Sequence, residues 1–421
     1  MDNVSIRESP VERIHLLAAS TATAIILNHL GTMTTSPTCV INRTLALAWQ
    51  LSHLTLDQLL LGMVLDSIIS WRITSPFKAE DPFEPTPFLR LIFRSPVKLL
   101  LYHAYHILTS LYSRPDPHTP PIRVVCISDT HNNLPNPSDV PHGDILIHAG
   151  DMTIDGSIDE IQKQVDWLAA LPHKEIIAIS GNHDTYLDPR TRPSLREDQR
   201  TGAIDWKRVH YLQHRRLSLN ITVEPKVKQE GTGNGCAEST TRLLSGEARQ
   251  RRIVVYGAPQ IPACGPMSVH AFQYPRGLDA WSETVPVETD ILVTHTPPKY
   301  HRDLPLPEGM GCEHLAAEVK RVKPALHVFG HVHWGAGQEV VWWDGCHDAY
   351  EKGMGMKHGW MRGLLSPWLW LCTVRVLYRG LRELAWDRVW GGRGERTVMV
   401  NAAQMKGNTG QLGNIVQVVD I

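Results

Sequence analysis

Residues 176–188 read IIAISGNHDTYLD, a short apolar run that ends in an amide, an imidazole and a carboxylate side by side. A continuous run of Ile and Ala is typical of a strand that is buried on both faces. A turn at Gly181 would then direct Asn182, His183 and Asp184 outward from the end of that strand. Such a strand end can form a binding site or an ordinary turn, and this stretch alone does not distinguish the two.

The same order, an apolar run followed by polar residues, recurs along the chain after residue 122. The runs are IRVVCIS (122–128), DILIHAG (144–150), EIIAIS (175–180), RIVVYGAP (252–259), DILVTH (290–295) and ALHVFGH (325–331). Helical patterns over 157–171 and 312–322 separate some of them. The alternation of strands with helices predicts an α/β sandwich whose strand ends converge on one edge.

The polar residues at these strand ends are of the types that bind metal ions. In chain order the clusters are Asp129 with His131, Asp151, Asn182 with His183, His295, and His331 with His333. Asp129 and His131 are two residues apart, and so are His331 and His333. This spacing places both side chains of a pair on one face of an extended backbone. One pair is weak evidence, because alternation along a strand produces it without any metal. Five clusters in a fixed order favour one shared site.

The candidate ligands outnumber the positions around a single tetrahedral ion. Even seven oxygen and nitrogen donors, one fewer than the residues named, would be too many for one zinc, and no thiolate joins them. They suffice for two ions if one carboxylate bridges. Two-metal sites hold their ions about 3.5–4 Å apart, which suits in-line displacement at a phosphate ester.

Composition limits the class and the compartment of the protein. The chain has 421 residues, enough for one large domain with inserts or for two or three domains, and a formal net charge of -1. This balance does not favour a long nucleic acid as the substrate. The seven cysteines are odd in number and form no Cys-x-x-Cys pair, and residues 1–17 do not resemble a secretory signal. We therefore expect an intracellular, cytoplasmic protein.

Residues 1–120 differ in pattern from the rest and are predicted to form a helical N-terminal region. Apolar residues recur at helical spacing in 44–71 and 87–112, but the charges within both stretches make neither a convincing membrane span. These helices either pack on the main domain or form a surface that contacts a membrane or a partner. A Pro-rich joint over 113–123 then leads into the second region, predicted over 121–421.

Two inserts are predicted within the second region. The stretch at about 224–252 is polar and rich in Gly, Ser and Thr, which indicates a mobile loop. The stretch at about 344–396 includes GWMRGLLSPWLWLCTVRVLYRGLRELAWDRVW (359–390). Trp and Leu interspersed with Arg suit an interfacial helix, and they equally suit a helical excursion that packs against the N-terminal helices. This insert is thus a second candidate for peripheral membrane or partner contact.

The order Asp-x-His, Gly-Asp, Gly-Asn-His-Asp, His and Gly-His-x-His resembles the calcineurin-like metallophosphoesterases over about 122–421, the inserts aside. The stretches VVCISDTHN (124–132), DILIHAGDMT (144–153), HTPPKY (295–300), GCEHL (311–315) and HVFGHVHWGAG (327–337) are most similar to the metallophosphoesterase-domain (MPPED-type) branch. The resemblance implies a four-layer α/β/β/α sandwich with an N-terminal helical extension and a helical Trp-rich insert.

The resemblance also implies a role for each site residue, with two ions drawn from Mn, Fe and Zn. One ion would be held by Asp129, His131, Asp151 and His333. The other would be held by Asp151, Asn182, His295 and His331. A hydroxide shared by the ions would attack phosphorus, His183 would protonate the leaving group, and Asp184 would orient the His183 ring.

The leading hypothesis is a phosphoesterase that hydrolyses phosphodiester or phosphomonoester bonds of a small substrate. The MPPED-type features favour phosphodiesters, including cyclic nucleotides. The alternative is a non-catalytic scaffold of the same fold that binds a partner or a membrane through its helical regions. The presence of His183 beside a complete set of ligands argues against the scaffold, which has no need of a general acid.

Overall fold

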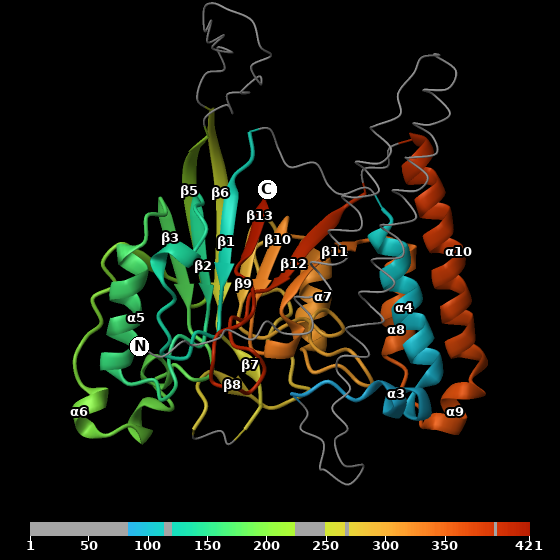
Figure 1. The fold of residues 1–421 in the computed structure, drawn as a ribbon, viewed down its shortest axis with the longest axis horizontal. Helices are drawn as coiled ribbons and strands as arrows, with labels where there is room; N and C mark the ends of the chain where they lie inside the picture. Colours follow the sequence, from blue (N-terminus) through green and yellow to red (C-terminus); the bar gives the residue numbers. More distant parts are fainter. Residues whose placement is uncertain (1–82, 113–119, 224–248, 266–268, 391–393) are drawn as a thin grey trace, which may run out of the picture. The chain divides into compact units, whose positions relative to one another are not determined.

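The computed structural model describes residues 83–112, 120–223, 249–265, 269–390 and 394–421 (Figure 1). All of these belong to one compact unit that spans residues 73–421. The helix predicted within 44–71 and most of the polar insert predicted at 224–252 lie outside the described residues.

Two mixed β-sheets form the centre of this unit. The first has the strand order β13-β1-β2-β3-β4 and the second has the order β11-β12-β10-β9-β6-β5. The strands of the first sheet are β1 (Arg123–Ile127), β2 (Ile145–Ala149), β3 (Glu175–Ile179), β4 (Val209–Tyr211) and β13 (Gln417–Asp420). The strands of the second sheet are β5 (Arg215–Val223), β6 (Arg249–Ala258), β9 (Ile291–Thr294), β10 (Leu326–Phe329), β11 (Gly337–Trp342) and β12 (Arg396–Asn401). A short pair, β7 (Ile261–Pro262) and β8 (Gln273–Tyr274), lies apart from both.

The six apolar runs of the sequence all form strands, as predicted. In the first sheet β1, β2 and β3 are parallel neighbours, and in the second sheet β6, β9 and β10 are parallel neighbours. Continuous apolar strands suit this arrangement because both faces of each sheet are covered. The carboxyl ends of parallel strands lie at the same edge, which is where the polar clusters follow them.

The layers follow the predicted α/β/β/α order. A buried apolar cluster between the sheets includes Val124, Ile147 and Val293. Helix α5 (Ile158–Ala170) covers the outer face of the first sheet, and helix α7 (Glu313–Val322) covers that of the second. A capping box, in which Ser157 and Glu160 bond each other's backbone N–H, fixes the start of α5.

The Trp-rich insert is helical and leaves the second sheet between two antiparallel neighbours, β11 and β12. It contains α8 (Gly345–Met354), α9 (Trp360–Leu364) and α10 (Pro367–Trp390). These pack against α4 (Pro96–Ser110), which follows α3 (Phe88–Arg94), along one side of the sandwich (Figure 1). The predicted excursion that packs on an N-terminal helix is therefore present. No described helix is both long and apolar enough to cross a bilayer.

Contacts between α4 and the insert are both apolar and polar. The rings of Tyr105 and Tyr350 stack with their centroids 4.0 Å apart. The buried Lys98 Nζ donates to the carbonyl of Met354 at 2.7 Å, which satisfies an acceptor at the C-terminal end of α8. Burial lowers the pKa of Lys98 to about 8, and this contact is consistent with a cation at a helix C-terminus.

One boundary differs from the prediction. Residues 249–252 were expected in the polar insert, but they form the start of β6 and pair with residues 220–223 of β5. The buried side chains of Ile221 and Val223 explain the difference, because a strand that packs on the core requires a partner along its whole length. The short helix α6 (Glu197–Arg200) lies in the connection between β3 and β4.

Candidate metal centre

The strand ends bring the predicted ligands together at one edge of the sandwich. Asp129 follows β1, Asp151 follows β2, Asn182 follows β3, His295 follows β9 and His331 follows β10. The donor atoms of Asp129, His131 and His333 all lie within 4.8 Å of one another. The same holds for Asp151, His295 and His331, and for a third group of His131, Asp151 and His183. The first two groups are parts of the two ligand sets implied by the resemblance, without Asp151 in the first and without Asn182 in the second.

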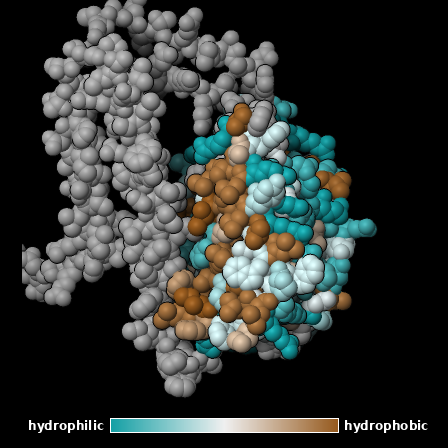
Figure 2. Space-filling view, turned by 90° about the vertical axis from the view of Figure 1, so that its right-hand side faces the viewer, coloured by the Kyte–Doolittle hydropathy of each residue, from teal (hydrophilic) through white to brown (hydrophobic). Residues whose placement is uncertain are grey.

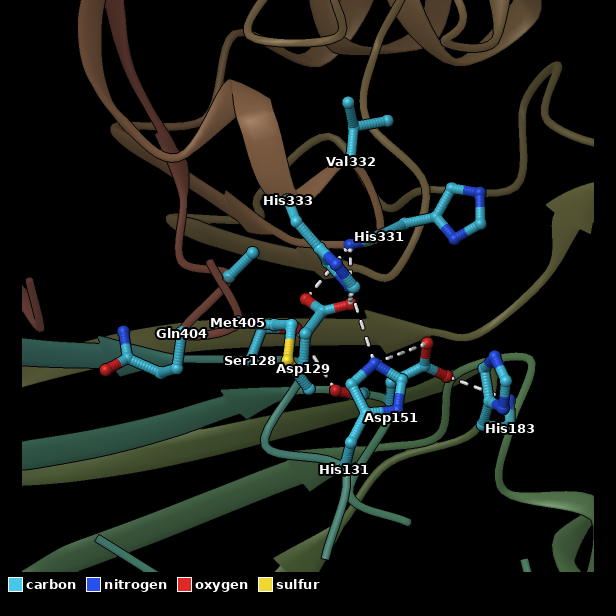
Figure 3. Close-up of polar contacts among 12 residues, drawn as sticks. Ser128, Asp129, His131, Asp151, His183, His331, Val332, His333, Gln404 and Met405 are labelled. Carbon is cyan, nitrogen blue, oxygen red and sulfur yellow. Dashed lines mark hydrogen bonds and ion pairs between the residues drawn. The ribbon is translucent and has the colours of Figure 1, made fainter. Parts of the chain in front are cut away.

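The distances between donor atoms suit shared cations. His333 Nε2 lies 3.3 Å from Asp129 Oδ1 and 3.4 Å from His131 Nε2. In the second group His295 Nε2 lies 3.3 Å from Asp151 Oδ2. Ligands about 2.0–2.2 Å from one tetrahedral ion lie about 3.3–3.6 Å apart, so these residues fit metal ions. Figure 3 shows the side chains of Asp129, His131, Asp151 and His333 pointing toward one another.

The amide of Asn182 is held between two histidines. Its Oδ1 lies 3.1 Å from His295 Nε2, and its Nδ2 lies 3.3 Å from His270 Nδ1. This places the amide oxygen among the donors of the second group. Sequence reasoning missed His270, because a single histidine in an unpatterned segment gives no signal of its own.

The backbone beneath the site has an uncommon conformation. Asp129, His131, Asp151 and His331 have positive φ values of 54°, 44°, 53° and 68°. Non-glycine residues rarely adopt this region, and such strain persists only where surrounding contacts enforce it. Here Asp129 N donates to Gly150 O at 3.0 Å, and both Asp129 oxygens lie 3.0 Å from the N of His331. The loops from the two sheets are therefore locked to each other.

Two glycines permit this close approach. A Cβ at Gly181 would lie 2.2 Å from Asp151 Oδ1, and a Cβ at Gly330 would lie 2.1 Å from Asp129 Oδ2. No larger residue fits at either position without moving a buried carboxylate. The Gly-Asn-His and Gly-His patterns thus have a steric cause.

The charges of the cluster are strongly coupled. Burial would raise the pKa of Asp151, but His295 and His183 oppose it and hold that pKa well below the ordinary value. Burial would lower the pKa of His295, but Asp151 raises it to about 9. Burial, with His295 nearby, lowers the pKa of His331 to about 3. The edge therefore offers an anionic carboxylate and a neutral His331, while His295 would have to release a proton to bind a divalent cation.

His183 occupies a different position from the donors of the two main groups. Its backbone N–H donates to Asp151 Oδ1 at 2.8 Å, and its ring Nδ1 donates to the carbonyl of Ile154 at 2.9 Å. The second ring nitrogen, Nε2, then remains for other contacts. The ring also meets those of His131 and His270 edge to face, with centroids 4.9 and 5.2 Å away.

Asp184 does not orient the His183 ring, contrary to what the resemblance implies. Its buried carboxylate instead accepts from Gly181 N at 2.8 Å, from Thr153 N at 3.1 Å and from the Thr153 hydroxyl at 2.7 Å. The carbonyl of Ile154, and not Asp184, accepts a hydrogen bond from the ring of His183. Asp184 therefore holds together the turns after β2 and β3. Burial and the neighbouring Asp151 raise its pKa to about 6.

A pocket of about 190 Å³ opens over these residues. Besides donors of the metal groups, its lining includes Phe83, Cys264, His270 and Asn408. The ring of Phe83 meets that of His331 edge to face, with centroids 5.3 Å apart. These lining residues come from segments that carry no recognisable pattern, so the sequence did not point to them.

Comparison with known proteins identifies the family. The calcineurin-like phosphoesterase family matches residues 122–335, about half of the chain. The chain belongs to this family. The match covers the clusters from Asp129 to His333, and therefore all the predicted metal ligands.

The proteins similar to this chain include members of the expected metallophosphoesterase-domain branch. Human and mouse metallophosphoesterase domain-containing protein 1 are each 35% identical over 237 residues, which covers 53% of this chain and 65% of theirs. A UPF0046 protein of Caenorhabditis elegans is 32% identical over 223 residues, covering 52% of this chain and 67% of that protein. A probable rhamnogalacturonate lyase C of Emericella nidulans is 39% identical over 288 residues, covering 68% of this chain but 23% of that protein.

The position of Asp184 leads to a stability prediction. Asp184→Asn replaces one accepting oxygen by an NH₂ group that faces backbone donors, so we expect the free energy of unfolding to fall by about 1–3 kcal/mol. Urea denaturation at pH 8 measures this, with Asp139→Asn, an exposed aspartate, as the matched control. Unchanged stability of Asp184→Asn would contradict the assigned structural role.

Proposed function

We propose that this family member is a dinuclear metal-dependent phosphoesterase that hydrolyses a small phosphodiester or phosphomonoester. The observation that best supports this is the position of Asp151, whose carboxylate belongs both to a group with His131 and to a group with His295 and His331. A carboxylate shared between two donor groups is what a bridged pair of ions requires.

The proposed ligands divide between the two ions. One ion would be bound by Asp129, His131, Asp151 and His333, and the other by Asp151, Asn182, His295 and His331. When bound, the ions would supply an activated water nucleophile and neutralise charge on the phosphoryl oxygens. The mixture of oxygen and nitrogen donors is compatible with Mn, Fe or Zn.

His183 is proposed as the general acid. Because its Nδ1–H is engaged by the carbonyl of Ile154, its Nε2 is the nitrogen that would deliver a proton to the departing oxygen. Asp184 would support this step indirectly, by fixing the turn that carries His183. His270, which faces both His183 and Asn182, would keep the Asn182 oxygen directed at the ions.

The size of the pocket suits a phosphoryl group. Its volume of about 190 Å³ is close to the share of about six water molecules in the liquid, each about 30 Å³. The branch resemblance favours phosphodiesters, including cyclic nucleotides, and the near-neutral chain does not favour a long nucleic acid.

An assay of the full chain tests the catalytic proposal. With Mn²⁺ supplied, we expect His183→Ala to lower kcat on bis(p-nitrophenyl) phosphate by about 10²–10⁴-fold while bound metal is retained. Asp151→Ala should lose both metal and turnover, because it removes the proposed bridge. His142→Ala, an exposed histidine outside the pocket, is the matched control and should behave as wild type.

The scaffold alternative predicts a different outcome. If wild type hydrolyses neither the diester nor p-nitrophenyl phosphate faster than Asp151→Ala, the chain is not a phosphoesterase of this kind. A scaffold would still bind metal under the same conditions, so metal content separates an inactive scaffold from a chain that lacks the metal centre.

We further propose that the helical side of the molecule binds an anionic lipid surface. Figure 2 shows apolar side chains gathered on the side where α3, α9 and α10 lie in Figure 1. The exposed residues of this apolar face are Leu89, Ile92, Phe93, Trp360, Met361, Leu364, Leu365, Trp368, Trp370, Val374, Leu377, Tyr378, Leu381, Trp386 and Val389. Contiguous apolar surface of this kind marks an interaction site more often than chance.

The arrangement of arginines supports a lipid surface as the occupant. On α10 the buried positions Leu369, Cys372 and Val376 face the fold, and the apolar face lies outward. Arg375 and Arg382 are seven residues apart, about two turns, so they form a row beside that face. Trp and Leu with flanking Arg are typical of helices that lie in the headgroup region, where Arg contacts anionic lipid.

Vesicle sedimentation of the full chain tests this surface. We expect binding to vesicles of phosphatidylcholine with phosphatidylserine, and at least tenfold weaker binding for the double variant Leu377→Glu/Leu381→Glu, which puts charge into the apolar face. Arg375→Glu should remove the preference for anionic vesicles. Leu134→Glu, exposed elsewhere, is the control. Equal binding by all variants, or a dimer in solution that binds no vesicles, would contradict the proposal.

A further inference from the structure

A second cluster of metal-type donors lies outside the pocket. It consists of His301, in the loop after β9, and of His347 and Glu351 on α8, and their donor atoms all lie within 4.8 Å of one another. None of the three lines the pocket of the metal centre. His347 and Glu351 are four residues apart, so both project from one face of the helix.

Two buried ring nitrogens of this cluster face one another with few partners in the described part of the chain. Nε2 of His301 has no hydrogen-bond partner, and Nε2 of His347 has only the Glu351 carboxylate, 3.5 Å away; the two residues are 1% and 0% exposed. A buried polar atom without a partner is costly. An ion shared by both imidazoles and Glu351 would satisfy both nitrogens.

The opposite ring nitrogens are held as in metal-bound histidines. His301 Nδ1 lies 2.9 Å from a carboxylate oxygen of Glu339, and His347 Nδ1 lies 3.1 Å from the hydroxyl of Tyr105. A histidine that binds metal through one nitrogen commonly donates from the other to a carboxylate or similar group. These contacts leave each Nε2 available to the cluster.

The third donor is a carboxylate with one oxygen available. Glu351 Oε1 lies 3.5 Å from His347 Nε2, within the range of about 3.3–3.6 Å expected for two ligands of one tetrahedral ion. The other oxygen, Oε2, accepts from Lys320 Nζ at 2.9 Å. Burial would raise the pKa of Glu351, but His347 and Lys320 lower it to about 2, so it is an anion at neutral pH.

Two carboxylates flank the cluster, and each already has a partner. Glu339, whose side chain is 10% exposed, lies 2.9 Å from His301 Nδ1, and Glu351 lies 2.9 Å from Lys320 Nζ. Burial would lower the pKa of His301, but Glu339 raises it. A divalent ion between the imidazoles would therefore displace a proton from His301 and take the place of its positive charge beside the two carboxylates.

We propose that His301, His347 and Glu351 bind a zinc ion that ties the Trp-rich insert to the loop after β9. Two imidazoles and one carboxylate form a zinc-type donor set, with the fourth position left to water. Because α8 and this loop are far apart in sequence, the ion would join the helical layer to the sandwich. Its binding energy would add to the stability of the folded chain.

Zinc stoichiometry of matched full-length variants tests the site. After equilibration with zinc and removal of unbound metal, elemental mass spectrometry measures the number of zinc ions bound per chain. We expect Glu351→Gln and His347→Gln each to bind one zinc fewer than wild type. Asp348→Asn is the matched control, because Asp348 also binds Lys320, at 2.7 Å, but lies outside the donor set.

The comparison can be repeated in an Asp151→Ala background, where loss of the first centre leaves this cluster as the main zinc site. There the loss of zinc caused by Glu351→Gln should remain one equivalent, whatever the activity of the chain. If Glu351→Gln and His347→Gln bind as much zinc as Asp348→Asn, the cluster is a hydrogen-bonded network without metal. Glu351 is partly exposed, so its variant keeps the test valid if His347→Gln fails to fold.

Discussion

The buried carboxylate of Asp151 links the separate strand ends into one site. It lies 3.3 Å from His295 Nε2 and 3.8 Å from His131 Nε2, and it accepts the backbone N–H of His183 at 2.8 Å. An anion at 2% exposure is stable only with such partners. The positive φ of Asp151 and the glycine at position 181 both allow this arrangement, because they let the backbone come close enough to surround the carboxylate.

The geometry of parallel strands explains why so much of the site could be predicted from the sequence. Parallel strands end at a common edge, so Asp129, Asp151, Asn182, His295 and His331 had to lie near one another once each apolar run was recognised as a strand. The runs predicted an α/β sandwich, and the four-layer order came from the family resemblance. This pattern did not determine the register of the strands or the residues at which the inserts begin and end. For this reason β6 begins earlier than predicted.

The remaining parts depend on contacts that leave no local signal. The resemblance implied that Asp184 orients the His183 ring, but backbone N–H groups of the turns bind its carboxylate instead. His270 reaches the pocket from a segment without a motif. The helical pattern of residues 96–110 predicts a helix, but it does not say that α4 packs on α8 and contributes Tyr105 to a second donor cluster.

The structure therefore places two groups of histidine and carboxylate donors on one chain, and the segment from His295 to His301 contributes to both. The central claim is that the first group holds two ions bridged by Asp151. Anomalous X-ray diffraction from crystals grown with Mn²⁺ tests it most directly. The account predicts two peaks about 3.5–4 Å apart, one beside Asp129 and His333 and one beside His295. A single peak, or none, at this edge would contradict it.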